Sequence, residues 1–297
     1  MQASRRAFLR MTIRAHVCAR RVRGTAPSFV LPGRHIAAPR VSLAVLMSGV
    51  FLASTGAVTH ARSRESAVAV KAEELYNSPS YSRRELMQFL ERAVDANPRD
   101  VGLLWRLARA KYDVATLPST TPVEKKTLIY RARDVIQSAL ELDANDFAVH
   151  KWFGIVLSSI GEFEGSKVTI ANSFIVRDHW LKAIELNPSD ATSFNLLGRW
   201  CLTIADISWI ERQLAAAIFG TPPRATYADA LAYFLQADAI SPGFWKKNSL
   251  QIAQTYLKMK DTAQAKDWLV RTLAVPVSTP EDKQVHDEAQ TLLSTLK

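Results

Sequence analysis

The chain has 297 residues, of which 48% are hydrophobic and 22% are charged, and this composition excludes a disordered or collagen-like protein. No run of 18 residues is wholly apolar, so a polytopic membrane protein is also excluded. Two cysteines, Cys18 and Cys201, are too few for a disulfide scaffold or a cysteine-based zinc site, although one disulfide between them stays open.

The net charge of +10 is unevenly placed along the chain. Residues 1–64 hold eleven arginines, no lysine and no acidic residue. Subtracting those eleven from 38 leaves 27 basic residues against 28 acidic ones in residues 65–297, a net charge of −1. A body that binds nucleic acid normally carries its own basic surplus, so we expect no nucleic-acid partner.

The composition of residues 1–64, rich in arginine and free of acid, is typical of a mitochondrial targeting sequence. Arg6, Arg10 and Arg14 recur at every fourth position beside an apolar row, so a helix here would be amphipathic. The alternative is a basic arm that contacts a polyanion.

An uncharged segment, residues 41–58, lies inside this leader. As a helix it would extend about 27 Å, which barely matches the hydrocarbon core of a bilayer. The segment is therefore a weak membrane anchor or part of a cleaved leader. Arginines on both sides leave its orientation open.

From about residue 70 a short sequence motif, called the phrase below, recurs along the chain. In each copy Asn or Pro ends one helical pattern, and a second helical pattern follows. Its four copies are VDANPRD (94–100), LDAND (142–146), LNPSD (186–190) and ISPGF (240–244). Turns this short keep consecutive helices antiparallel.

After each phrase an apolar residue is followed by a small one, at Ala108, Gly154, Gly198 and Ala253. Small residues at fixed points let paired helices pack closely, as in tetratricopeptide (TPR) repeats. The spacings are 46, 44 and 55 residues, longer than the TPR period of about 34. The sequence thus predicts an all-α, TPR-like superhelix of antiparallel helix pairs over residues 70–297, with inserted and lengthened helices.

Two further helices are predicted outside this pattern. Residues 207–226 contain an apolar stripe at helical spacing, formed by Trp209, Ile210, Leu214, Ala217 and Ile218. Because such stripes usually face a core, we expect this helix to plug one end of the superhelix. Residues 279–297 begin with Thr279 as N-cap and Pro280 at the first helical position, and they predict a polar terminal helix.

The sequence contains no Walker A loop, no dinucleotide-binding fingerprint, no H-E-x-x-H and no G-x-S-x-G motif. His150 and His179 lack acids or thiols at ligand spacing, so we expect packing or surface roles for them. Cys201 is expected to be a buried, inert thiol. We therefore predict no catalytic residue, no cofactor and no metal.

In TPR arrays the first helix of each pair lines a concave groove, and the residues facing it can be counted from the small residue. Three positions before it lie Trp105, Lys151, Asn195 and Leu250, and one position after it lie Arg109, Ile155, Arg199 and Gln254. With Lys247 and Lys258 this candidate face has five basic residues, against Asp113 as its one acid. Such a groove would attract an acidic peptide or a phosphate-bearing lipid head. The alternative is that these cations pair with acids on neighbouring helices.

Residues 152–282 resemble the regulator of microtubule dynamics family, most specifically in LGRW (197–200), SWIE (208–211) and FGTPP (219–223). The resemblance implies a TPR-like domain in a non-enzymatic protein that binds microtubules, located at mitochondria as well as at microtubules and spindle poles. In some relatives it implies a tether between mitochondria and another membrane, with lipid binding. Two hypotheses follow, a microtubule adaptor and a membrane-anchored mitochondrial tether or lipid-binding module. The first places the chain in the cytoplasm on microtubules and the second at the mitochondrion.

Overall fold

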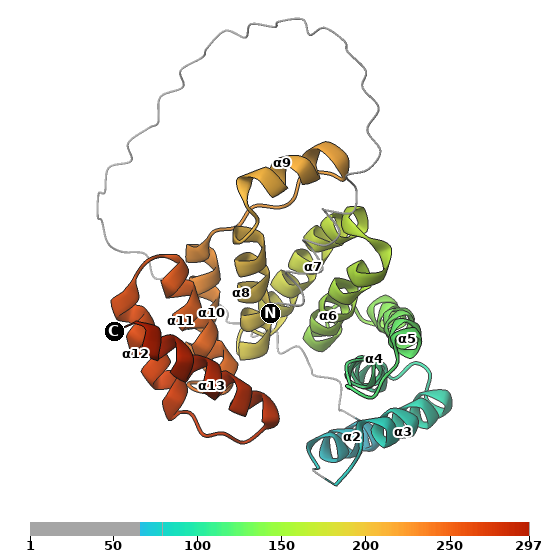
Figure 1. The fold of residues 1–297 in the computed structure, drawn as a ribbon. Coiled ribbons are helices and arrows are strands. Elements are labelled where there is room, and N and C mark those ends of the chain that lie inside the picture. The colour runs from blue at the N-terminus through green and yellow to red at the C-terminus, as the bar shows by residue number, and fades with distance from the viewer. Residues whose placement is uncertain (1–65, 79, 297) are drawn as a thin grey trace, which may run out of the picture. The chain divides into compact units, whose positions relative to one another are not determined.

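The computed structural model describes residues 66–78 and 80–296, which form twelve helices and no strand (Figure 1). The predicted all-α fold class is confirmed. The helices are α2 (Ala67–Asn77), α3 (Arg83–Ala96), α4 (Val101–Ala115), α5 (Pro122–Leu142), α6 (Phe147–Glu164), α7 (Ser166–Leu186), α8 (Ala191–Ala205), α9 (Trp209–Ile218), α10 (Tyr227–Ile240), α11 (Lys246–Lys258), α12 (Thr262–Ala274) and α13 (Pro280–Thr295). None of these helices has the length and apolarity that crossing a membrane requires. The predictions for the leader and for residues 41–58 fall outside the described residues.

The recurring phrases are helix junctions, as predicted, and the aspartate that closes each of the first three is a helix N-cap. Asp100, Asp146 and Asp190 accept hydrogen bonds from backbone N–H groups in the first turns of α4, α6 and α8. These bonds satisfy donors that the helix itself leaves unpaired. The aspartate therefore sets the residue at which the first helix of each helix pair begins.

The predicted small residues lie where paired helices approach most closely. Ala108 on α4 and Ala253 on α11 are fully buried. A Cβ atom added at Gly198 on α8 would lie 2.7 Å from the Phe234 ring of α10. A Cβ added at Gly154 on α6 would overlap the Trp180 ring of α7. The predicted close packing of helix pairs is confirmed.

The structure adds a pair that the phrases did not predict, because no phrase precedes it. Helix α2 packs on α3 and α4 ahead of the first junction. The Ser66 side chain caps α2, and Ala69 and Ala72 are fully buried. They belong to a cluster with Leu86 of α3.

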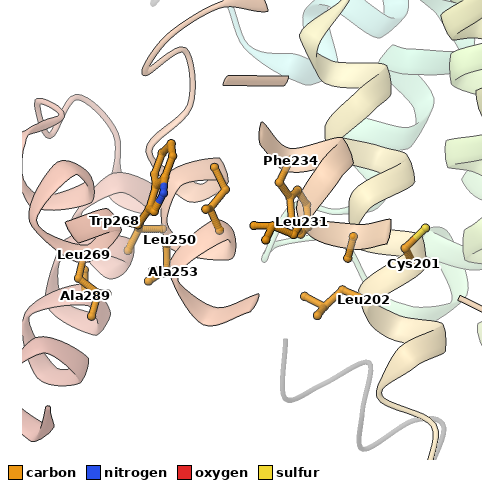
Figure 2. Close-up of a cluster of buried hydrophobic side chains, with 12 residues drawn as sticks. Cys201, Leu202, Leu231, Phe234, Leu250, Ala253, Trp268, Leu269 and Ala289 are labelled. Atoms are coloured by element: carbon orange, nitrogen blue, oxygen red, sulfur yellow. The ribbon is translucent and has the colours of Figure 1, made fainter. Parts of the chain in front are cut away.

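One hydrophobic cluster joins the last five packed helices, α8 and α10 to α13 (Figure 2). Phe234 of α10, Leu250 of α11 and Leu269 of α12 lie within it. Helix α13 closes the array and buries only Val285 and Ala289. The predicted cap at Thr279 and the polar terminal helix are both confirmed.

Helix α9 forms as predicted, but the expectation that its apolar stripe plugs the superhelix is wrong. Trp209 is 73% exposed, Ile210 64% and Ile218 57%, and only Ala215 of this helix is buried. In Figure 1 α9 stands apart from the packed helix pairs. The apolar spacing was sufficient to predict a helix, but most of that stripe is exposed.

Candidate binding face

The candidate surface, called the binding face below, consists of the counted positions on α4, α6, α8 and α11, together with Lys247 and Lys258. The structure places several of these side chains against the neighbouring first helix or its cap. Arg109 of α4 contacts α2, Lys151 of α6 contacts the N-cap of α8, and Asn195 of α8 contacts α11. Much of the binding face therefore connects the first helix of one pair with the first helix, or its N-cap, of the next pair.

At its N-terminal end, Arg109 is buried and forms a two-pronged ion pair with Glu73 of α2. Its two terminal nitrogens donate to the two carboxylate oxygens of Glu73, at 3.0 and 2.9 Å. Burial alone would raise the pKa of Glu73, but the hydrogen bonds and charges of Arg109 and Arg106 outweigh it and lower that pKa. Trp105 is half-buried, with the Arg106 guanidinium 4.1 Å from its ring.

Three predicted lysines are also ion-paired. Lys151 Nζ donates to Oδ1 of Asp190 at 3.1 Å, and both side chains are largely buried. Lys258 Nζ donates to Oδ1 of Asp206, the residue that follows α8, at 2.9 Å. Lys247 pairs with Glu281 of α13.

Asn195 lies in a buried amide network rather than on an open surface. Its Nδ2 donates to Oδ1 of Asn248 at 2.8 Å and to Oε1 of Gln251 at 3.0 Å. Asn248 in turn donates to the carbonyl of Phe234. Leu250 is buried as well. This network links α8, α10 and α11.

Arg199 is the exception among the five predicted cations. It is exposed on α8, and among the described residues no ion pair involves it. The predicted acid, Asp113, is half-buried on α4, where burial raises its pKa to about 6. The pairing alternative thus holds for four cations, and the free positive charge of the face reduces to Arg199.

Sequence reasoning missed the four acids that pair with these cations. Each acid lies 34 to 52 positions from its partner, on another helix or cap. Only Asp190 carried a signal, because it closes a recurring phrase. Spacing along one helix cannot reveal contacts between helices.

His150 and His179 meet between α6 and α7, which the sequence did not predict. Their Nδ1 atoms lie 3.0 Å apart, and His150 Nε2 lies 2.9 Å from the carbonyl oxygen of Ala144. A carbonyl only accepts, so Nε2 of His150 carries a proton. The His179 ring also stacks on Phe153 at 4.2 Å. Burial and the neighbouring His150 lower the pKa of His179 to about 4. Among the described residues no third ligand completes a metal site with this pair.

One of the sequence segments that carry the family resemblance lines a small cavity, together with the residue that follows another. Leu197 and Trp200 from LGRW line one side, and Arg224, which directly follows FGTPP, lies on another. The cavity has a volume of about 180 Å³ between α7, α8 and α10. Cys201 also lines it, and burial raises the pKa of its thiol to about 12; the expected burial of this thiol is confirmed.

A family model described as regulator of microtubule dynamics protein 1-3 matches residues 68–297. The chain belongs to the regulator of microtubule dynamics family. It is 42% identical over 245 residues to regulator of microtubule dynamics protein 1 of Mus musculus, covering 82% of this chain and 78% of that protein. It is 34% identical over 214 residues to protein 3 of Xenopus laevis, covering 72% of this chain but only 46% of that longer protein.

Among solved structures, the chain resembles a thermophilic TPR protein from Thermus thermophilus. The TM-score is 0.55 at 15% identity, and the match covers 77% of this chain and all of the other. An identity this low shows the fold alone, and it confirms the predicted TPR-like fold. The matching family is named for the regulation of microtubule dynamics.

Proposed function

We propose that this member of the regulator of microtubule dynamics family is a non-enzymatic adaptor that associates with microtubules through its binding face. Support comes from family membership and from one structural observation. Arg199 presents an exposed guanidinium on α8, inside the LGRW segment. A guanidinium binds carboxylates in a two-pronged geometry. The ligand class that it favours is an acidic peptide, such as the tail of tubulin.

The other four cations of the binding face are already ion-paired and should contribute less to such binding. They are Arg109, Lys151, Lys247 and Lys258. An acidic ligand would have to displace Glu73, Asp190, Asp206 or Glu281, each already within contact distance of its partner. Replacing one carboxylate by another yields little net free energy. Arg199 is therefore the residue whose loss should weaken binding most.

The test is co-sedimentation of the full-length chain with polymerised microtubules, together with binding to a polyglutamate peptide. Arg199→Glu should weaken both at least about fivefold, since reversing one close charge contact is worth about 1 kcal/mol or more. Raising the salt concentration should mimic the variant, because exposed charges are screened within about 8 Å at physiological ionic strength. The matched control is Arg131→Glu, an exposed arginine on the second helix α5. Equal loss in both variants, or no loss in either, would reject the binding face.

We also propose that residues 1–64 direct the chain to mitochondria, on the strength of their eleven arginines and absent acids. A reporter fused to these residues should be imported, and reversing Arg6, Arg10 and Arg14 to Glu should abolish import. A reporter that stays in the cytosol would leave the cytoplasmic, microtubule-bound alternative.

A further inference from the structure

Helix α9 exposes its apolar side, and this surface is separate from the binding face. The α9 face is formed by Ile210, Leu214 and Ile218, which recur at every fourth position, with Trp209 at its N-terminal edge, and each is at least 36% exposed. Four large apolar side chains on one short helix form a patch of the kind that marks a contact with a protein or a membrane.

Polar contacts, not apolar packing, hold α9 to the rest of the domain. The Arg212 guanidinium donates to the carbonyls of Ile204, Pro222 and Pro223, at 3.1, 3.2 and 2.7 Å respectively. Ala215 is its only buried residue. Trp209, Ile210 and Ile218, each more than half exposed, thus contribute little to keeping α9 in place.

The charges of α9 are also already engaged. Glu211 is in a capping box with Ser208, and Arg212 binds the three carbonyls. The α9 face itself carries no charge, so it matches an apolar phase rather than a charged peptide.

The dimensions of α9 argue against a second copy of the chain as the occupant. Ten residues of helix present a face of roughly 15 by 10 Å. Stable protein interfaces bury about 800 Å² on each partner, several times that area. A bilayer sets no such lower limit, and a tryptophan beside aliphatic side chains is typical of helices that lie in the membrane interface.

The sequence ahead of the described domain contains a candidate for a second attachment to a membrane. Seven residues, 59–65, lie between the uncharged segment 41–58 and Ser66, the N-cap of α2. Seven residues span at most about 25 Å. If that segment enters a bilayer, the domain stays beside it, and a weak apolar contact then suffices because the local concentration of lipid is high.

We propose that the α9 face docks onto the surface of a phospholipid bilayer, with Trp209, Ile210, Leu214 and Ile218 inserted at the interface. This inference does not depend on microtubule binding. The two surfaces also differ in chemistry, since α9 docking should resist salt whereas binding at Arg199 should not.

The experiment places an environment-sensitive fluorophore on Ile210→Cys in the full-length chain with Cys18→Ser. Cys201 is buried with a raised thiol pKa and should not react. With phosphatidylcholine vesicles, the emission should shift to the blue and be quenched by lipids that carry a quencher near the headgroup. A label on Arg131→Cys should stay in an aqueous environment, and high salt should not reverse the shift.

A second variant tests the face without relying on the label site alone. Trp209→Ser with Ile218→Ser should lower the affinity for vesicles, read from the lipid concentration at half-maximal shift, at least about tenfold, because two of the four apolar side chains no longer enter the interface. The matched control is Val123→Ser with Val270→Ser, two exposed apolar residues on other helices. It should retain the shift.

Three outcomes would overturn the proposal. A label that stays aqueous on vesicles would show that α9 does not touch lipid. A shift without vesicles that grows with protein concentration would show that a second copy covers the face. A shift that needs anionic lipid and disappears in salt would assign membrane contact to charged groups elsewhere.

Discussion

Helices α8 and α9 follow each other directly in the chain, and both are amphipathic. Helix α8 packs its apolar side against the rest of the domain, whereas α9 turns a polar side towards it. Helix α8 buries Leu197 and Cys201 and exposes Arg199. Helix α9 directs Arg212 towards backbone carbonyls and exposes Trp209 and Ile210. Periodicity predicts that a helix forms, whereas the available neighbours decide which side is covered.

The difference separates residues that hold the fold from residues available to partners. The apolar side of α8 meets α7 and α10, so changes there should unfold the domain. The apolar side of α9 is largely exposed, so changes at its exposed residues should leave stability intact.

The largest effect is expected at the closest approach in the α8 pair. Gly198→Ala should lower the free energy of unfolding by about 2–3 kcal/mol, because the added Cβ would overlap the Phe234 ring. Helix propensity alone would give the opposite sign, a gain of about 1 kcal/mol. Denaturant unfolding of the purified chain measures the difference, and a stabilised variant would disprove the packing.

A somewhat smaller and local effect is expected at Arg212. Arg212→Met keeps an unbranched apolar stem but loses three hydrogen bonds to carbonyls. Helix α9 should open more easily by about 2 kcal/mol, with little change in global unfolding. Limited proteolysis should then cut within residues 207–226, and uniform resistance would show that other contacts hold α9.

Acid should loosen the α6–α7 pair but not α9, whose polar contacts are made to backbone carbonyls. The pKa of His179 is lowered to about 4 from 6.5, so the unfolded chain binds more protons between these values. Stability from this group is therefore complete above pH 6.5 and is lost as the pH falls towards 4, by about 1 kcal/mol for a partly exposed ring.

Asp113 opposes that trend, because its raised pKa makes the folded chain the stronger proton binder between 3.8 and about 6. The unfolding free energy should thus be followed against pH in an Asp113→Asn background. Adding His179→Gln should flatten the slope. An unchanged slope would show that His179 is not the titrating group.

The smallest effect is expected on the exposed side of α9. Trp209→Ser with Ile218→Ser should change the free energy of unfolding by less than about 0.5 kcal/mol, because surface substitutions rarely do more. Denaturant unfolding against the Val123→Ser, Val270→Ser control measures it. A loss of about 2 kcal/mol would mean that these side chains pack within the fold.

The sequence predicted what depends on local spacing and missed what depends on contacts between helices. The phrases that end in Asp100, Asp146 and Asp190 marked the junctions because capping is a local property. The candidate binding face was counted from positions along single helices and stays a prediction. Its pairing with distant acids, and the outward stripe of α9, depend on neighbours that no single-helix pattern encodes.

The most direct test is hydrogen exchange of the full-length chain, alone and with each partner, comparing α8 with α9. Alone, the α8 backbone should exchange far more slowly than that of α9. Vesicles should then protect residues 209–218, while microtubules should protect the segment around Arg199 and leave α9 unchanged. Equal protection of the two helices in the free chain, or microtubule protection confined to α9, would contradict the division between them.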